Sequence, residues 1–230
     1  MILLSLLLTS AQAADVIRFS SGFTNVYAIV GPENIILVDA HNPDQEDWII
    51  KQLERHDLSI DDVSLVIATH AHSDHAGSAA ALQKRGIPVA LGADDAYMAR
   101  RGQHDEPMST DWRGDIVKRT VDPDYPAFEP DVLVTDRLDL SPYGVNAEAV
   151  VVGGHSPGSL VIKLDDQRVI SGDLLRGHMI RQRRPALHFF QLDLEVAHQA
   201  ARTLIEEGAT ELLVAHGKNL PAGKVSRWLD

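Results

Sequence analysis

A dense group of histidines and aspartates directly follows one apolar run of the sequence. His70, His72, Asp74 and His75 fall within the stretch LVIATHAHSDHAG, residues 65–77. In an extended segment, residues two apart face the same side, so His70 and His72 can bind one ion together. Asp74 and His75 lie where the chain turns into a helix, so we expect their side chains to point to a position next to the ion bound by His70 and His72. Imidazole and carboxylate ligands suit zinc, and the stretch therefore predicts a metal site.

Three further ligand-type residues stand at comparable places later in the chain. His155 ends VVVGGH, Asp173 ends VISGD and His216 ends LLVAH, so each directly follows a β-rich run. Alone, each has an ordinary explanation, such as a turn around His155 or a capping role for Asp173. Ser156, beside His155, is interpreted as part of that turn rather than as a nucleophile. The sequence contains no cysteine, so any metal must be held by histidine and carboxylate side chains.

The elements that must position these residues follow from hydrophobic periodicity and turn residues. The run 63–68 is continuously apolar, as expected of a strand buried on both faces. Residues 102–130 show no period and are rich in Asp, Pro and Gly, which predicts a long loop, either a lid over a site or a solvated excursion. We expect strands at 26–30, 35–39, 63–68, 87–91, 132–140, 147–155, 159–164, 168–172 and 211–216, and helices at 44–56, 74–86, 93–102 and 193–207.

The ordered set of HxHxDH followed by a later His, Asp and His resembles the metallo-β-lactamase superfamily. The resemblance extends from the opening strands to His216 and implies an α+β fold, the αββα four-layer sandwich. Carried over residue by residue, it implies a first metal held by His70, His72 and His155, a second held by Asp74, His75 and His216, and Asp173 bridging both. Asp39, at the end of IILVD, matches an early aspartate that supports the ligands from behind.

The resemblance also implies a reaction. Two zinc ions per chain, or iron or manganese in their place, would carry a hydroxide that attacks an ester, lactone or thioester carbonyl. Asp74 is the expected catalytic proton acceptor and relay. An exported, metal-dependent zinc hydrolase acting on a small molecule is the predicted function.

Other members of the superfamily set the alternatives. β-Lactamase or phosphodiesterase activity on the same site remains open, although the β-lactamases place Cys or a small residue where this chain has Asp173. Nucleases of the superfamily require a basic surface, and enzymes of the glyoxalase II type add a helical region after the last ligand, where only residues 217–230 follow here. A mononuclear iron enzyme resembling persulfide dioxygenases, with two His and one Asp as ligands, is the alternative of another class.

The segment 175–190 is unusually basic for this chain. Arg181, Arg183 and Arg184 are candidates to dock an anionic group of the substrate, because guanidinium groups pair with carboxylate or phosphate through two hydrogen bonds. The competing interpretation is a solvated loop whose arginines pair with the acidic surface.

Composition and the N-terminus indicate the class of protein and its location. A net charge of −12 over 230 residues argues against nucleic acid and anionic membranes as partners. The apolar run Ile2–Leu8, followed by Ala11-Gln12-Ala13, predicts a secretory signal at residues 1–13 and a periplasmic or secreted protein. A buried N-terminal strand is the alternative. We expect residues 14–230 to form a single hydrolase domain. The sequence indicates no oligomeric state.

Overall fold

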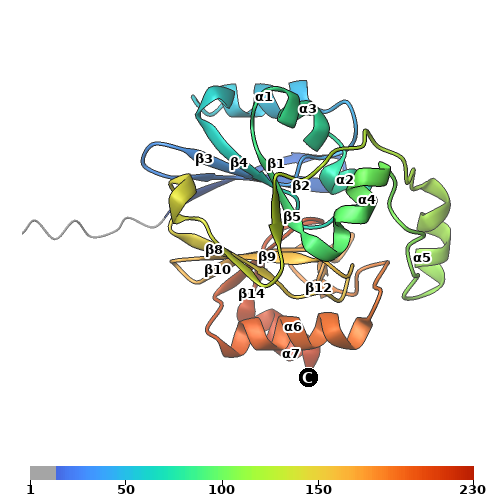
Figure 1. Ribbon diagram of the computed structural model, residues 1–230. Helices are drawn as coiled ribbons and strands as arrows, with labels where there is room; N and C mark the ends of the chain where they lie inside the picture. Colours follow the sequence, from blue (N-terminus) through green and yellow to red (C-terminus); the bar gives the residue numbers. More distant parts are fainter. Residues whose placement is uncertain (1–13) are drawn as a thin grey trace, which may run out of the picture.

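Two β-sheets lie face to face, and helices cover the outer face of each (Figure 1). The computed structural model describes residues 14–230, so the predicted signal at residues 1–13 lies outside the described residues. The N-terminal sheet has the strand order β1-β2-β3-β4-β5-β6, and the C-terminal sheet has the order β14-β13-β10-β9-β8-β7.

The strands of the first sheet are β1 (Asp15–Ser21), β2 (Thr24–Val30), β3 (Ile35–Val38), β4 (Val63–Ile67), β5 (Val89–Gly92) and β6 (Val132–Val134). Those of the second are β7 (Arg137–Asp139), β8 (Ala147–Val151), β9 (Leu160–Leu164), β10 (Arg168–Gly172), β13 (Glu211–Val214) and β14 (Leu220–Pro221). A separate hairpin pairs β11 (Arg176–Gly177) with β12 (Pro185–Ala186).

The helices are α1 (Glu46–Glu54), α2 (Ser73–Ala76), α3 (Ala79–Lys84), α4 (Ala96–Arg101), α5 (Trp112–Val117), α6 (Leu194–Glu206) and α7 (Ala222–Leu229). Short 3-10 turns span Ile60–Asp62, Ala93–Asp95, Lys118–Thr120 and Ser141–Tyr143. None of the helices within residues 14–230 is long and apolar enough to cross a membrane.

Three separate apolar clusters correspond to the three interfaces of a four-layer sandwich. One joins the first sheet to its helices through residues such as Ile49 and Val66. A second, with Ile67 and Ile162, lies between the two sheets. The third packs the second sheet against α6 and α7 around Ala201. The predicted αββα fold is therefore confirmed, because each sheet buries both faces.

Strand direction places the candidate ligands along one edge. β3, β4 and β5 run parallel, and β8 runs the same way as β10 and β13 because β9 is antiparallel to β8 and to β10. The loops that follow β4, β8, β10 and β13 carry His70, His155, Asp173 and His216, respectively. The carboxyl ends of parallel strands meet at one edge of a sheet, so the candidate residues gather there.

The helix expected over 74–86 is in fact two helices, α2 and α3. The backbone N–H groups of Gly77 and Ser78 donate to the carbonyl groups of His41 and Ala40 instead of continuing the helix. A Cβ at Gly77 would lie 2.4 Å from the nitrogen of Pro43, so only glycine permits this close approach. The interruption brings the loop after β3 against the segment that carries the candidate ligands.

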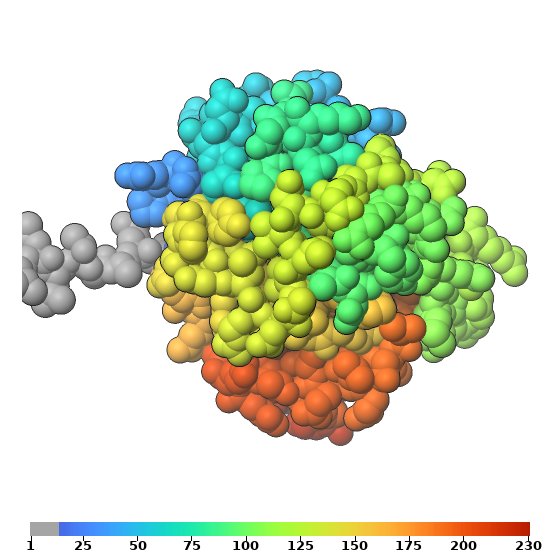
Figure 2. Space-filling model, viewed as in Figure 1, coloured from blue at the N-terminus to red at the C-terminus, as the bar shows by residue number. Residues whose placement is uncertain are grey.

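Two other expectations need correction. The single run 132–140 is divided between the sheets, since β6 pairs with β5 whereas β7 pairs with β8. The segment 102–130 is not wholly irregular, because it contains α5, where the Asp111 side chain accepts from the N–H groups of Arg113 and Gly114. In Figure 2 this green segment forms a lobe beside the stacked layers.

Candidate metal centre

The carboxylate of Asp173 lies at the centre of the cluster formed by the predicted ligands. Its Oδ2 lies 3.3 Å from Nε2 of both His75 and His216, 3.6 Å from Nε2 of His155 and 3.8 Å from Nε2 of His70. The Asp74 carboxylate lies 3.4 Å from Nε2 of both His75 and His216. These contacts arrange the predicted second group and the predicted bridging residue around one small volume.

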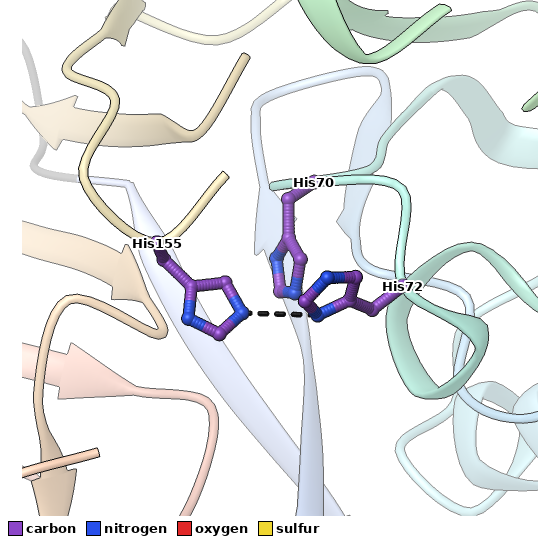
Figure 3. Close-up of side chains that lie close together, drawn as sticks. All are labelled: His70, His72 and His155. Atoms are coloured by element: carbon purple, nitrogen blue, oxygen red, sulfur yellow. Dashed lines mark hydrogen bonds between the residues drawn. The ribbon is translucent and has the colours of Figure 1, made fainter. Parts of the chain in front are cut away.

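The first group converges beside it, as Figure 3 shows for His70, His72 and His155. The three rings come from two loops, and Nε2 of His155 lies 3.0 Å from Nδ1 of His72. Their ligand atoms lie within 4.8 Å of one another. The structure therefore brings together all seven residues that the sequence predicted as ligands.

Most of these imidazoles are oriented through the nitrogen that points away from the cluster. Nδ1 of His75 lies 2.9 Å from Asp39, Nδ1 of His155 lies 2.9 Å from the Phe190 carbonyl oxygen, and Nδ1 of His216 lies 2.7 Å from the Phe23 carbonyl oxygen. Metal-binding histidines commonly donate their other ring N–H to an oxygen in this way, which fixes the ring and its tautomer.

Buried polar atoms without partners provide an independent test of the fit to metal. Among residues 14–230, Nε2 of His70, Nε2 of His75 and Oδ1 of Asp173 are buried and make no hydrogen bond. Leaving such atoms unpaired costs roughly 1–3 kcal/mol each. Because all three face the same cluster, a divalent cation bound there would satisfy them together.

The electrostatics of the cluster separate its histidines into two kinds. Burial lowers the pKa of His70, His72 and His155, so these rings are neutral and ready to bind a cation. Burial would also lower the pKa of His216, but Asp173 and Asp74 raise it to about 9. Burial acts in the same direction on His75, but the neighbouring Asp74 and Asp173 raise its pKa above the usual range.

Asp39 lies behind the cluster, as expected of a supporting residue. One carboxylate oxygen contacts His75, and the other accepts from the backbone N–H and the hydroxyl of Thr69 at 2.8 and 2.9 Å. Its backbone has a φ of 69°, a left-handed conformation that is uncommon outside glycine. This conformation is held in place by the hydrogen bond from its N–H to the Ile67 carbonyl group.

His188 is a member of the cluster that the ligand pattern did not include. Its side chain is nearly buried, and its Nε2 lies 3.2 Å from Oδ2 of Asp173. Its Nδ1 lies 2.9 Å from the Phe190 carbonyl oxygen, which also accepts from His155. In the sequence, His188 is only one residue of the basic segment 175–190. Its spacing from the predicted ligands does not indicate metal binding.

Asp95 is a second residue that sequence reasoning did not select. Its carboxylate accepts from the Ala71 N–H at 3.1 Å, the Ser156 hydroxyl at 2.7 Å and the Gly158 N–H at 2.7 Å. It therefore joins the loop that carries His72 to the loop that carries His155. Its position just past a strand end is the signal that could have identified it.

Replacing Asp95 by alanine should lower the free energy of unfolding by about 3 kcal/mol, because two buried backbone N–H groups and one hydroxyl lose their acceptor. Urea denaturation of the purified protein measures this change. Asp94→Ala, an exposed carboxylate next in the chain, is the matched control and should change stability by less than about 0.5 kcal/mol. Equal effects of the two substitutions would contradict the role given to Asp95.

A small cavity opens beside His72 and His155. Its other walls come from α4, from residues 105–108 and from the segment around Phe190 and Leu192. Residues 105–108 belong to the segment 102–130, so part of this segment lines a cavity at the candidate site. Met98, Pro107, Met108 and Leu192 make much of the wall apolar.

The three arginines predicted to bind substrate lie elsewhere. Arg181, Arg183 and Arg184 are exposed in the turn between β11 and β12, and none lines this cavity. The Arg184 N–H donates to the Arg181 carbonyl group, which closes the turn. Their part in substrate binding stays a prediction.

Comparison with known proteins places the chain in a family. The model of the metallo-beta-lactamase superfamily matches residues 20–216, and the chain belongs to that superfamily of metal-dependent hydrolases. Several solved structures share the fold.

BJP-1, a subclass B3 metallo-beta-lactamase of Bradyrhizobium japonicum, is 20% identical, with 88% of this chain and 75% of that chain covered and a TM-score of 0.65. A metallo-beta-lactamase from Pontibacter korlensis is 18% identical, with 95% and 97% covered and a TM-score of 0.66. A metallo-beta-lactamase family protein from Thermus thermophilus is 18% identical, with 94% and 78% covered and a TM-score of 0.67. At these identities the likeness shows the fold alone.

Proposed function

We propose that this protein is a dinuclear zinc hydrolase that cleaves an ester, lactone or thioester bond of a small molecule. The observation that carries the proposal is the convergence of seven ligand-type side chains, Asp173 among them, with buried atoms that have no protein partner. Seven ligands are more than one tetrahedral zinc ion uses, which favours two ions over one. The same excess argues against the mononuclear iron alternative.

Each residue has a proposed role. His70, His72 and His155 would hold one ion, Asp74, His75 and His216 would hold the other, and Asp173 would contribute to both. When bound, such ions polarise a carbonyl group and lower the pKa of a water ligand towards neutrality. Asp39 and the Phe190 carbonyl group keep the imidazoles in their binding tautomers.

Asp74 is proposed to accept and relay the proton. Its side chain is 31% exposed, whereas that of Asp173 is 3% exposed, so only Asp74 is in ready exchange with solvent. The Thr24 hydroxyl donates to its Oδ2 at 3.3 Å and fixes the orientation of the carboxylate.

The cavity beside His72 favours a substrate with an apolar group next to the scissile carbonyl. Its thioether and aromatic walls would contact that group, and a carbonyl bound beside His72 and His155 would lie next to the cluster. A panel of lactones, thioesters, esters, phosphodiesters and a chromogenic β-lactam, offered to zinc-loaded protein, tests the proposal. Turnover of the β-lactam alone would favour the activity named for BJP-1, and no turnover of any substrate would contradict a hydrolase.

Zinc binding to metal-free protein should release protons at pH 7.5, because His216 is protonated below its raised pKa of about 9, the pKa of His75 is also raised, and both rings must be neutral to bind. Affinity for zinc should therefore rise as the pH increases towards about 9, the pKa of His216. Calorimetry in buffers of different ionisation enthalpy counts the protons. His216→Ala should release fewer protons, because it removes one protonated ligand and the ion that would displace the proton of His75; an unchanged count would contradict the assignment.

His188→Ala should weaken zinc retention by about 10- to 100-fold if the ring contacts the bound metal or orients its neighbours. The measurement is competition with a chromophoric chelator, which does not depend on activity. His178→Ala, which removes an exposed histidine from the same basic segment, is the control and should leave retention unchanged. Equal retention in His188→Ala and wild type would exclude His188 from the metal centre.

Export to the periplasm or beyond the cell is proposed from the sequence of residues 1–13. Strand β1 begins at Asp15, so cleavage before Ala14 or Asp15 would leave every described strand intact. Mass spectrometry of protein recovered from its native source should find an N-terminus there. An intact Met1 in a cytosolic fraction would contradict export.

A further inference from the structure

A second cavity, of about 300 Å³, lies on the other side of the segment that carries His188. It opens to solvent and is bordered by the β11–β12 hairpin, by α5 and by α7, and none of the seven predicted ligands lines it. Side chains alternate along residues 187–189, so His188 faces Asp173 while Leu187 and Phe189 face this cavity. The cavity is therefore separate from the metal centre.

Arg176 places a buried positive charge in the wall of this cavity. The residue is 6% exposed, and its guanidinium group lies 4.0 Å from the centre of the Phe189 ring. Nη1 donates to the Gly177 carbonyl group at 3.0 Å. Within residues 14–230, Nε of Arg176 is buried and has no hydrogen-bond partner.

This charge has no acidic partner of its own. No carboxylate within residues 14–230 forms a salt bridge with Arg176. Arg113 also lines the cavity, but its guanidinium is paired with Asp111 at 2.6 Å. Burial lowers the pKa of Arg176 and the neighbouring Arg113 lowers it further, while Asp111, which is paired with Arg113, offsets part of this effect. A buried cation without a counter-ion is costly, and in a chain of net charge −12 its lack of a partner is unusual.

We infer that this cavity binds a small organic monocarboxylate, with the carboxylate on Arg176 and the apolar body against Phe189, Leu187 and Trp228. Guanidinium groups hold carboxylates through short, charge-assisted hydrogen bonds, and Arg176 lines the cavity without a salt-bridge partner among residues 14–230. The single uncompensated charge matches a monoanion better than a phosphate dianion. The volume is at the lower end of the range for small-molecule sites, which limits the ligand to roughly the size of benzoate.

The test uses the zinc-loaded full chain, titrated with benzoate and followed by calorimetry and by the fluorescence of Trp228, which lines the cavity. Binding should be saturable. Benzamide, which has the same shape without the charge, should bind at least about 10-fold more weakly, because it cannot offer a carboxylate to Arg176. Inorganic phosphate should also bind more weakly, because it has no apolar body. Equal affinity for benzamide, or for phosphate, would overturn the inference.

Two substitutions locate the binding. Arg176→Met removes the charge and should weaken benzoate binding at least about 10-fold. Because Arg176 is buried and its replacement can impair folding, Leu187→Glu provides a second route: the added carboxylate, at a half-buried cavity position, would pair with Arg176 and exclude benzoate.

Arg181→Gln, which removes a nearby exposed charge, is the matched control and should leave the affinity within about 2-fold. A carboxylate bound at the zinc ions instead would keep its affinity in the Leu187→Glu protein, and that result would overturn the inference.

Discussion

His216→Ala is expected to reduce bound zinc from about two ions per chain to about one and to lower kcat/KM at least ~100-fold. His216 is the best ligand to remove, because its side chain is 18% exposed, whereas that of His75 is fully buried and linked to Asp39. Without His216, the second ion would keep only Asp74, His75 and the shared Asp173 as protein ligands. The first group, His70, His72 and His155, stays complete.

Metal analysis of extensively dialysed protein, together with hydrolysis of the best substrate from the panel, measures both effects. His56→Ala removes an exposed histidine at the end of α1, far from the cluster in sequence, and should change neither. A zinc content of one in wild type as well as in the variant would show that the dinuclear proposal is wrong. Unchanged zinc with lost activity would instead remove His216 from the ligand set.

Asp74→Asn should lower kcat by about 10²- to 10⁴-fold at saturating zinc, since general acid–base groups typically contribute this much. The amide retains one oxygen that can still bind metal, but it cannot accept a proton at neutral pH. The substitution therefore tests the proton-transfer role while disturbing the ligand set as little as possible. Zinc content must be measured in the same samples, so that loss of metal is not mistaken for loss of proton transfer.

Thr24→Val is the matched control for Asp74. It removes the hydroxyl that donates to the carboxylate while keeping the size and the branching at Cβ. Its effect on kcat should stay below about 10-fold, because the hydroxyl only orients the carboxylate and its hydrogen bond, at 3.3 Å, is long and therefore weak. If Asp74→Asn with two zinc ions bound retains kcat within about 10-fold of wild type, another group accepts the proton.

Strand-end patterning allowed the ligand set to be predicted without tertiary information. His70, His155 and His216 each follow an apolar run, and a side chain just past a strand end lies at the edge of the sheet, where ligand-type residues from several strands can meet. The resemblance supplied the order of the ligands and the αββα arrangement; the described residues show both sheets, and the seven side chains lie close together.

Local patterns were less informative where a distant backbone competes for hydrogen bonds. The Ala-rich run after Asp74 predicts one helix. However, the N–H groups of Gly77 and Ser78, which would have continued it, donate to the carbonyl groups of the loop after β3 instead. Likewise, the run 132–140 is uniformly β-forming, and only pairing with β5 and β8 divides it between two sheets.

The sequence by itself determined which side chains can bind metal, because residue type and strand-end position are local properties. Tertiary structure alone decided that His188 faces Asp173, that Asp95 joins two ligand loops and that Arg176, rather than Arg181, Arg183 or Arg184, is the buried arginine of its segment. The physical reason is that burial and partner choice in these loops depend on contacts between segments tens of residues apart. Such contacts are set by how the two sheets stack, and they leave no period in the sequence.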